Sequence, residues 1–199
     1  MNGFEKRTLE KKQQIIDTTF TLLNREQGLK ALKIEDIAQA ANVGKTTIFK
    51  YFGNKETLIH ETFTMFIDQI RQEAHVIMDK NLPFEETLIA LSQNKMHAIN
   101  LISKQFYLDM MAYMTEKNER GLSLLMEKYS KESIDMLLDL FHRGRKEGKV
   151  DLKYSDEFLI LYFQSLVEGM SHPTIYEKLL PYTQEWTEIL LKGMAPNRK

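Results

Sequence analysis

Apolar residues recur every three to four positions along most of the chain, and few residues interrupt this pattern. Between residues 9 and 26, for example, one helical stripe carries Ile15, Ile16, Phe20, Leu22 and Leu23. The 199 residues include only 9 Gly and 4 Pro, so helix-breaking positions are sparse, and the alternation typical of strands is missing. The sequence therefore predicts an all-α fold of about nine helices.

Breaks in the pattern divide the chain into an N-terminal three-helix unit and a C-terminal helical bundle. In the first unit we expect helices at about 9–26, 34–41 and 46–52. Gly28 ends the first of them, and Asn42 lies in a tight turn between the other two, because both residues tolerate positive φ. Further helices are expected at about 55–80, 84–101, 104–116, 119–146, 155–171 and 175–194. We therefore expect a helix-turn-helix domain over residues 1–54 and a helical domain over 55–199.

Composition and charge limit the class of protein and its partners. The net charge is −1, but residues 1–60 carry ten Lys or Arg against seven Asp or Glu, so any contact with nucleic acid is expected near the N-terminus. The chain has no cysteine and begins with a polar segment, and its longest apolar run, Phe158–Phe163, is too short to span a bilayer. We expect a cytoplasmic protein that does not bind membranes.

The stretch from Ile37 to Phe52 carries the functional signal, because it reads as a helix-turn-helix. Small Ala38 suits a close helix crossing, and apolar side chains join the two helices. The second helix then presents donors for phosphates and base edges, together with aromatic rings able to contact thymine methyl groups. The residues on this outward face are Lys45, Thr46, Thr47, Phe49, Lys50 and Tyr51.

Over about residues 9–60 the sequence resembles the TetR family of bacterial transcription regulators. The residues that carry the resemblance are Ile15, Ile16, Phe20 and Gly28, then Ile37-Ala38, Val43, Phe49-Lys50-Tyr51-Phe52 and Asn54-Lys55-Glu56-Thr57-Leu58. The resemblance implies that Lys45 and Thr46 approach base edges and that Thr47, Tyr51 and Lys55 approach phosphates. The family usually has serine at position 44, serine or threonine at 33 and tyrosine at 49, where this chain has Gly44, Lys33 and Phe49.

The C-terminal helices are expected to hold a ligand pocket and a dimer interface. A cluster of methionine and aromatic side chains suits an irregular apolar ligand, and the resemblance implies a pocket among the middle helices. The pocket residues expected here are Phe66, Ile70, Phe106, Met110, Met114 and Phe163. The last two helices carry surplus apolar residues suited to a four-helix homodimer interface, for which we select Tyr162, Leu166, Trp186 and Leu190.

The sequence thus predicts a homodimeric repressor that leaves a palindromic operator in double-stranded DNA when an apolar or cationic small molecule binds. Two alternatives stay open: a helix-turn-helix regulator with no small-molecule inducer, and a helical small-molecule-binding protein or enzyme. No catalytic constellation, metal-ligand spacing or cofactor motif is found, so we do not expect an enzyme, a metal or a cofactor.

Overall fold

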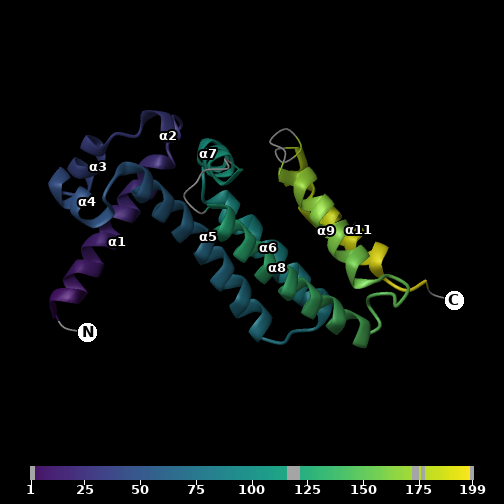
Figure 1. The fold of residues 1–199 in the computed structure, drawn as a ribbon. Helices are drawn as coiled ribbons and strands as arrows, with labels where there is room; N and C mark the ends of the chain where they lie inside the picture. The colour runs from purple at the N-terminus through teal and green to yellow at the C-terminus, as the bar shows by residue number, and fades with distance from the viewer. Residues whose placement is uncertain (1–2, 116–121, 172–174, 176–177, 198–199) are drawn as a thin grey trace. The chain divides into compact units, whose positions relative to one another are not determined.

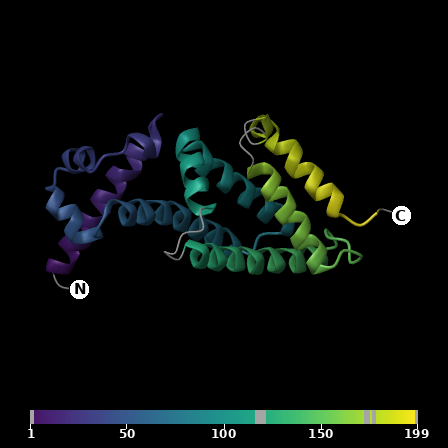
Figure 2. The same cartoon turned by 45° about the horizontal axis from the view of Figure 1, so that its top comes forward.

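The computed structural model describes residues 3–115, 122–171, 175 and 178–197. Within these ranges the chain forms ten α-helices and one short 3₁₀ helix and contains no strand, which confirms the all-α prediction. The chain forms two compact units (Figures 1 and 2). Unit 1 comprises residues 1–72 and 97–116, and unit 2 comprises residues 73–96 and 117–199.

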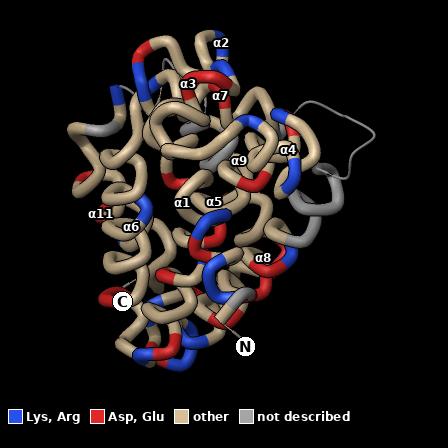
Figure 3. Tube along the Cα trace, turned by 90° about the vertical axis from the view of Figure 1, so that its left-hand side faces the viewer, with Lys and Arg blue, Asp and Glu red and all other residues tan. Residues whose placement is uncertain are grey.

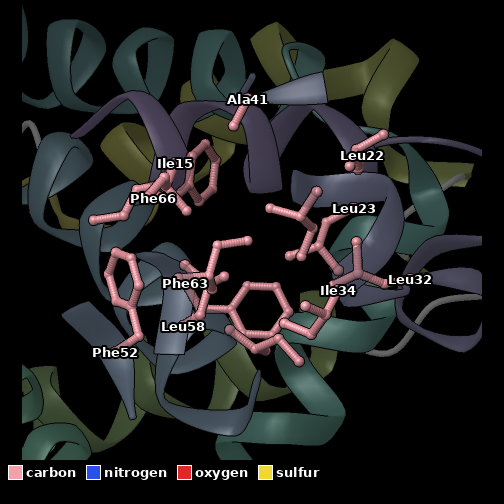
Figure 4. Close-up of a cluster of buried hydrophobic side chains, with 14 of the residues drawn as sticks. Ile15, Leu22, Leu23, Leu32, Ile34, Ala41, Phe52, Leu58, Phe63 and Phe66 are labelled. Carbon is pink, nitrogen blue, oxygen red and sulfur yellow. The ribbon is translucent and has the colours of Figure 1, made fainter. Parts of the chain in front are cut away.

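Unit 1 contains the helix-turn-helix and the helices that support it. It holds α1 (Gly3–Leu23), α2 (Gly28–Ala31), α3 (Ile34–Ala40), α4 (Lys45–Phe52), the first part of α5 (Lys55–Asp79) and α7 (Lys104–Thr115). The core of unit 1 draws buried side chains from α1, α3, α4, α5 and α7, and Leu29 of α2 packs against it. Figure 4 shows Phe52 and Phe66 on one side of this cluster and leucine and isoleucine side chains on the other. Phe63 and Phe66 of α5 both contact Phe106 of α7, with ring centroids 5.3 and 5.4 Å apart. These contacts attach α7 to α5, and the ring of Phe20 on α1 also lies 5.1 Å from that of Phe106.

Unit 2 is a helical bundle with its own core. It contains the end of α5, most of α6 (Phe84–Asn100), α8 (Leu122–Lys146), α9 (Asp156–Ser171), the 3₁₀ helix η1 (Leu180–Tyr182) and α11 (Thr183–Met194). Its fully buried side chains include Phe84, Leu140, Phe141, Val150 and Leu159. Glu147 joins two elements by accepting a 2.8 Å hydrogen bond from the backbone N–H of Phe84, so a carboxylate at the end of α8 caps the start of α6. Two distinct cores therefore stabilise the chain.

Several helix boundaries differ from the prediction. The first helix begins at Gly3 rather than near residue 9, and it ends at Leu23, before Gly28. Gly28 does have the expected positive φ, +49°, but it begins the additional turn α2. The expected last helix, 175–194, is interrupted by η1, where Pro181 lacks the backbone N–H that a continuous helix needs. The predicted domain boundary at residue 54 stays a prediction, while the compact unit around the helix-turn-helix extends further along α5 and includes α7.

Candidate DNA-binding site

The turn between α3 and α4 is fixed by backbone hydrogen bonds. Asn42 has φ +50°, as predicted, and this left-handed residue reverses the chain. The N–H of Val43 donates to the carbonyl of Ala38 at 3.0 Å, and Gln14 of α1 donates to the carbonyl of Ala41 at 3.0 Å. The side chains of Ile37, Ala41 and Ile48 are fully buried beneath the turn. The angle between the two helices is therefore set by packing and by satisfied backbone groups.

The helix α4 has one buried face and one exposed face. Ile48 and Phe52 are buried, and they hold the helix against the core. Lys45, Thr46, Phe49 and Lys50 are exposed, and Thr47 and Tyr51 are half-buried. Phe49 leaves 47% of its surface exposed, which is unusual for a phenylalanine and fits a side chain that meets a partner. The two lysines of α4 appear as blue segments along its trace (Figure 3).

Lys55 and Tyr51 also have structural contacts. The ammonium of Lys55 donates a hydrogen bond to the carbonyl of Leu32, in the connection between α2 and α3. The ring of Tyr51 packs edge-to-face against Phe52, with centroids 6.4 Å apart. Each side chain therefore helps to hold the motif together, and the sequence reasoning had assigned them only to phosphate contact.

The start of α5 has a cap that the sequence reasoning missed. The Asn54 side-chain oxygen accepts hydrogen bonds from the backbone N–H of Thr57 at 2.7 Å and from its hydroxyl at 3.0 Å. Asparagine followed three residues later by a hydrogen-bonding residue is a capping signal that could have been found in the sequence. This cap fixes the direction in which α5 leaves α4, and so orients Lys55 next to the motif.

A carboxylate lies beside the first lysine of the exposed face. The ammonium of Lys45 is 2.7 Å from Oε1 of Glu35, on α3. This hydrogen bond and the positive charge of Lys45 hold the pKa of the Glu35 carboxyl below its usual value, so the carboxylate stays ionised at neutral pH. Glu35 therefore reduces the positive potential that Lys45 presents, and it competes with a phosphate or base for the same ammonium.

We expect Glu35→Gln to raise the affinity for DNA of any sequence by roughly threefold to tenfold at low salt, because it removes a negative charge next to the lysine. Fluorescence anisotropy with a random duplex measures this change. Glu85→Gln is the matched control, since Glu85 also pairs with a lysine, Lys149 at 3.0 Å, but lies in unit 2. Equal affinity of Glu35→Gln and wild type would show that Lys45 does not lie close to DNA.

The helix α3 begins without a side-chain cap. Its N-cap residue, Lys33, has the extended backbone that caps require, φ −120° and ψ 148°, but its side chain makes no capping hydrogen bond. Asp36 lies three residues later, in the position that completes a capping box. Lys33→Ser should therefore raise the free energy of unfolding by about 1 kcal/mol, as measured by urea denaturation. The same change should weaken DNA binding if Lys33 contacts phosphate, and an unchanged unfolding midpoint would argue against the capping role.

Side chains of α1 and α7 fasten the motif to the rest of unit 1. Asn24, just after α1, donates to the carbonyl of Leu101 at 3.0 Å and accepts a hydrogen bond from the N–H of Ser103. Asp109 of α7 accepts a hydrogen bond from the N–H of Leu29 and so caps the short helix α2. These residues join segments about 80 positions apart in the sequence, and local patterns carry no signal for such pairs.

The expected pocket residues fall into two groups. Phe66, Phe106 and Met110 are buried in the core of unit 1, with Ile70 packed at its edge. Phe163 instead belongs to the core of unit 2, where its ring lies 5.1 Å from that of Phe141. Met114 was also expected here, but its side chain lies outside the described residues. The described members of the expected set therefore act as core residues in two separate units.

The expected dimer residues also differ in exposure. Leu190 is only 8% exposed and belongs to the core of unit 2, and Leu166 and Trp186 pack against that core. Of the four, only Tyr162 is exposed. The large exposed apolar side chains of α9 and α11 are Phe158, Leu161, Tyr162 and Ile189. Packing within the protomer thus uses the positions that the sequence pattern had favoured for a partner.

Among the described residues, no helix is both long and apolar enough to cross a bilayer. Within the same residues, no group of three or more His, Asp or Glu side chains is arranged to hold a metal ion.

Comparison with known proteins agrees with this geometry. The family model described as "Bacterial regulatory proteins, tetR family" matches residues 15–62, which hold the helix-turn-helix and its supports. The uncharacterized HTH-type regulator YhgD of Bacillus subtilis is 36% identical over 81 residues, or 41% of this chain and 42% of YhgD. This chain thus aligns with less than half the length of that relative.

Two longer matches cover most of the chain. The HTH-type transcriptional repressor KstR2 of Rhodococcus jostii is 25% identical over 75% of this chain and 74% of its own. The structure of the regulator FadR from Bacillus subtilis, in complex with stearoyl-CoA, has a TM-score of 0.68 at 19% identity and covers 91% of this chain and 98% of its own. The helix-turn-helix region of this chain therefore matches the TetR family of bacterial regulatory proteins, and the fold of the chain is similar to that of solved transcriptional regulators.

Proposed function

We propose that the protein is a homodimeric transcriptional repressor that binds a palindromic operator and leaves it when a small molecule binds. The observation that carries this proposal is the exposed face of α4, where Lys45, Thr46, Phe49 and Lys50 project from a helix that is held firmly by Ile48 and Phe52. A rigid helix with exposed donors and an exposed aromatic ring is suited to the major groove. Repression follows most simply, because a protein that only occupies a promoter blocks polymerase without further contacts.

Different residues of the site have different roles in this proposal. Lys45, Thr46 and Phe49 read base edges and thymine methyl groups, while Thr47, Lys50, Tyr51 and Lys55 approach phosphates. Lys55 has an ammonium with three donors, so it can keep its bond to the Leu32 carbonyl and still approach a phosphate. Tyr51 is half-buried with its ring against Phe52, and in this proposal its hydroxyl donates to a phosphate.

The dimer would form through α9 and α11, which share the core of unit 2 (Figures 1 and 2). One side of α9 carries three exposed apolar side chains at spacings of three and one residues, namely Phe158, Leu161 and Tyr162. Leu161 is 56% exposed. On α11, Ile189 is 66% exposed. Two such helices from each protomer make an isologous four-helix interface. We therefore propose the exposed side chains of α9 and α11 as the contacts, in place of Leu166, Trp186 and Leu190.

The effector would act by favouring a dimer shape in which the two α4 helices no longer match successive major grooves. Such a switch requires that the effector bind one shape more tightly than the other. The repressor KstR2 and the stearoyl-CoA complex of FadR support a ligand-responsive repressor, since both resemble this chain over most of its length. Because Phe66, Phe106 and Met110 are packed as core, the effector would bind at other residues.

Two substitutions test the DNA half of the proposal. Tyr51→Phe removes the hydroxyl but keeps the ring packing, so we expect affinity to fall several-fold on every DNA sequence alike. Thr46→Ala should instead change sequence preference. We expect the discrimination between bases at one position of each half-site to change by roughly fivefold to a hundredfold. Selection from a randomised duplex pool, followed by titration of the selected sites, measures both effects. Lys146→Ala, at the end of α8 in unit 2, is the control.

The two substitutions can fail separately. If Tyr51→Phe and Thr46→Ala both select and bind the wild-type sites with wild-type affinity, α4 is not the recognition helix. Loss of all binding together with a lowered unfolding midpoint would instead indicate damage to the fold. In that case Lys50→Ala, at an exposed position of the same helix, would be measured in place of these two variants.

A further inference from the structure

The first turns of α1 are exposed and positively charged. Residues 5–7 and 9–10 are exposed, and Leu9 leaves 55% of its surface accessible, so this part of α1 lies beyond the core of unit 1. Figures 1 and 2 show it extending past the end of α4. Against the two acidic residues Glu5 and Glu10, the segment carries four basic ones, namely Lys6, Arg7, Lys11 and Lys12. A helix of this charge next to α4 is suited to the phosphate backbone of DNA.

Lys12 is the basic residue that α1 directs toward α4. It precedes the buried residues Ile15, Ile16 and Thr19 by three, four and seven positions, so it continues their stripe along the helix. The core ends before this position, and the half-buried lysine places its ammonium over the ring of Phe52, 5.6 Å from the centroid. A cation from α1 thus lies at the last residue of α4.

The ammonium of Lys12 and the ring of Tyr51 lie against the same phenylalanine. Tyr51 packs edge-to-face on Phe52, with centroids 6.4 Å apart. In the proposed function the hydroxyl of Tyr51 donates to a phosphate. Because Lys12 contacts the neighbouring ring, its ammonium is within reach of the same phosphate or of the next one along the strand.

Lys12 also differs from the other basic residues of this segment in its partners. The other three bind acceptors on α1 itself: Lys6 pairs with Glu10 at 3.9 Å, Arg7 donates to the carbonyl of Gly3 at 3.0 Å, and Lys11 donates to Gln14 at 3.0 Å. Within the described residues, the ammonium of Lys12 makes no hydrogen bond and no ion pair. Its three donors are therefore left for an acceptor outside the protein.

We propose that Lys12 binds a DNA phosphate beside the groove that α4 enters, so that the first turns of α1 extend each half-site beyond the helix-turn-helix. This inference rests on the proposed function, since it adds a contact to the same DNA-binding surface. Phe52 is only 4% exposed and is fixed in the core, so the lysine stem is positioned before DNA arrives and loses little freedom on binding. A phosphate contact of this kind adds affinity without sequence preference.

Lys12→Met tests the contact, because it keeps an unbranched stem against Phe52 and removes the charge. At about 0.15 M salt, its affinity should fall roughly fivefold to twentyfold on a selected operator and on a random duplex alike. The log–log slope of affinity against salt should become shallower by about two, one phosphate for each protomer of the dimer. Lys12→Arg should keep the wild-type slope. Lys6→Met is the matched control, since it removes the same charge from another side of α1 and should change affinity less than about twofold.

Ethylation interference on the selected operator locates the contact. Wild type should bind poorly when one outer phosphate of each half-site is ethylated. Lys12→Met should bind that DNA as well as it binds unmodified DNA, while ethylation at the other contacted phosphates still interferes. A lysine that only stabilised the end of α4 would leave this pattern unchanged.

Folding is checked by urea denaturation, in which Lys12→Met should unfold at the wild-type midpoint; Lys12→Gln takes its place if it does not fold. The inference is overturned if the salt slope is unchanged, if Lys6→Met loses as much affinity, or if the same phosphates interfere in both proteins. Selection of a common site with equal salt slopes rejects this inference alone. If no common site is selected, the repressor proposal fails, and the slopes on the random duplex still decide whether Lys12 contacts phosphate.

Discussion

Leu161→Arg is expected to convert the dimer into a monomer and to weaken operator binding by at least about a hundredfold. Leu161 is 56% exposed on α9, beside Phe158 and Tyr162, whose rings stack with centroids 6.2 Å apart. At the centre of an apolar interface, a guanidinium would lose its water without gaining a partner, and two copies would meet across the two-fold axis. A monomer then binds each half-site independently and loses the advantage of two linked contacts.

Analytical ultracentrifugation and titration of a full operator and of a half-site measure this effect. The half-site affinity should stay within about threefold of wild type, because unit 1 is unchanged. Leu152→Arg is the matched control, since Leu152 is 81% exposed but lies in the connection between α8 and α9, outside the helices proposed to pair. A Leu161→Arg protein that remains dimeric at micromolar concentration would place the interface elsewhere.

Gly28→Ala should lower the free energy of unfolding by about 2–4 kcal/mol. Gly28 has φ +49°, which a residue with a Cβ adopts at a cost. An added Cβ would also lie 2.7 Å from Cγ of Gln105 and would collide with the Asp109 carboxylate. Asp109 would then have to move, and the N–H of Leu29 would lose its acceptor.

Urea denaturation measures this loss, and Gly193→Ala is the matched control. Gly193 lies inside α11, has no positive φ, and leaves an added Cβ nothing to touch within 4 Å. That change should be neutral or slightly stabilising, because alanine favours the helix. Asp109→Ala separates the two causes, since it removes the hydrogen bond while leaving the backbone of Gly28 unstrained. If Gly28→Ala is as stable as wild type, α7 does not hold α2 as described.

The helix-turn-helix could be predicted because its determinants are local. Asn42 takes the positive φ that its residue type favours, and the spacing of Ile37, Ala41 and Ile48 suffices to bury one face of each helix. Phe49 and Lys50 then had to be exposed, as they are. Within a motif of this length, the hydrophobic pattern and the turn residues agree, so one arrangement of the two helices satisfies both.

Other features depend on segments far apart in the sequence. The pattern could not show that Gly28 meets Asp109, or that Leu190 is used by the core of its own protomer while Ile189 is left exposed. An apolar residue on a C-terminal helix fits a core and an interface equally well, and only the packing of α9 against α11 separates them.

Binding of the protein to a randomised DNA pool and to its own upstream DNA, footprinted across a salt series, tests the central claim most directly. A dimer with one α4 helix per protomer should protect two symmetric half-sites whose centres lie about 34–36 Å apart or a multiple of that distance. Its affinity should fall steeply as salt rises, with a log–log slope set by the phosphates contacted. Selection of no common site, together with binding that is weak at every salt concentration, would contradict the account.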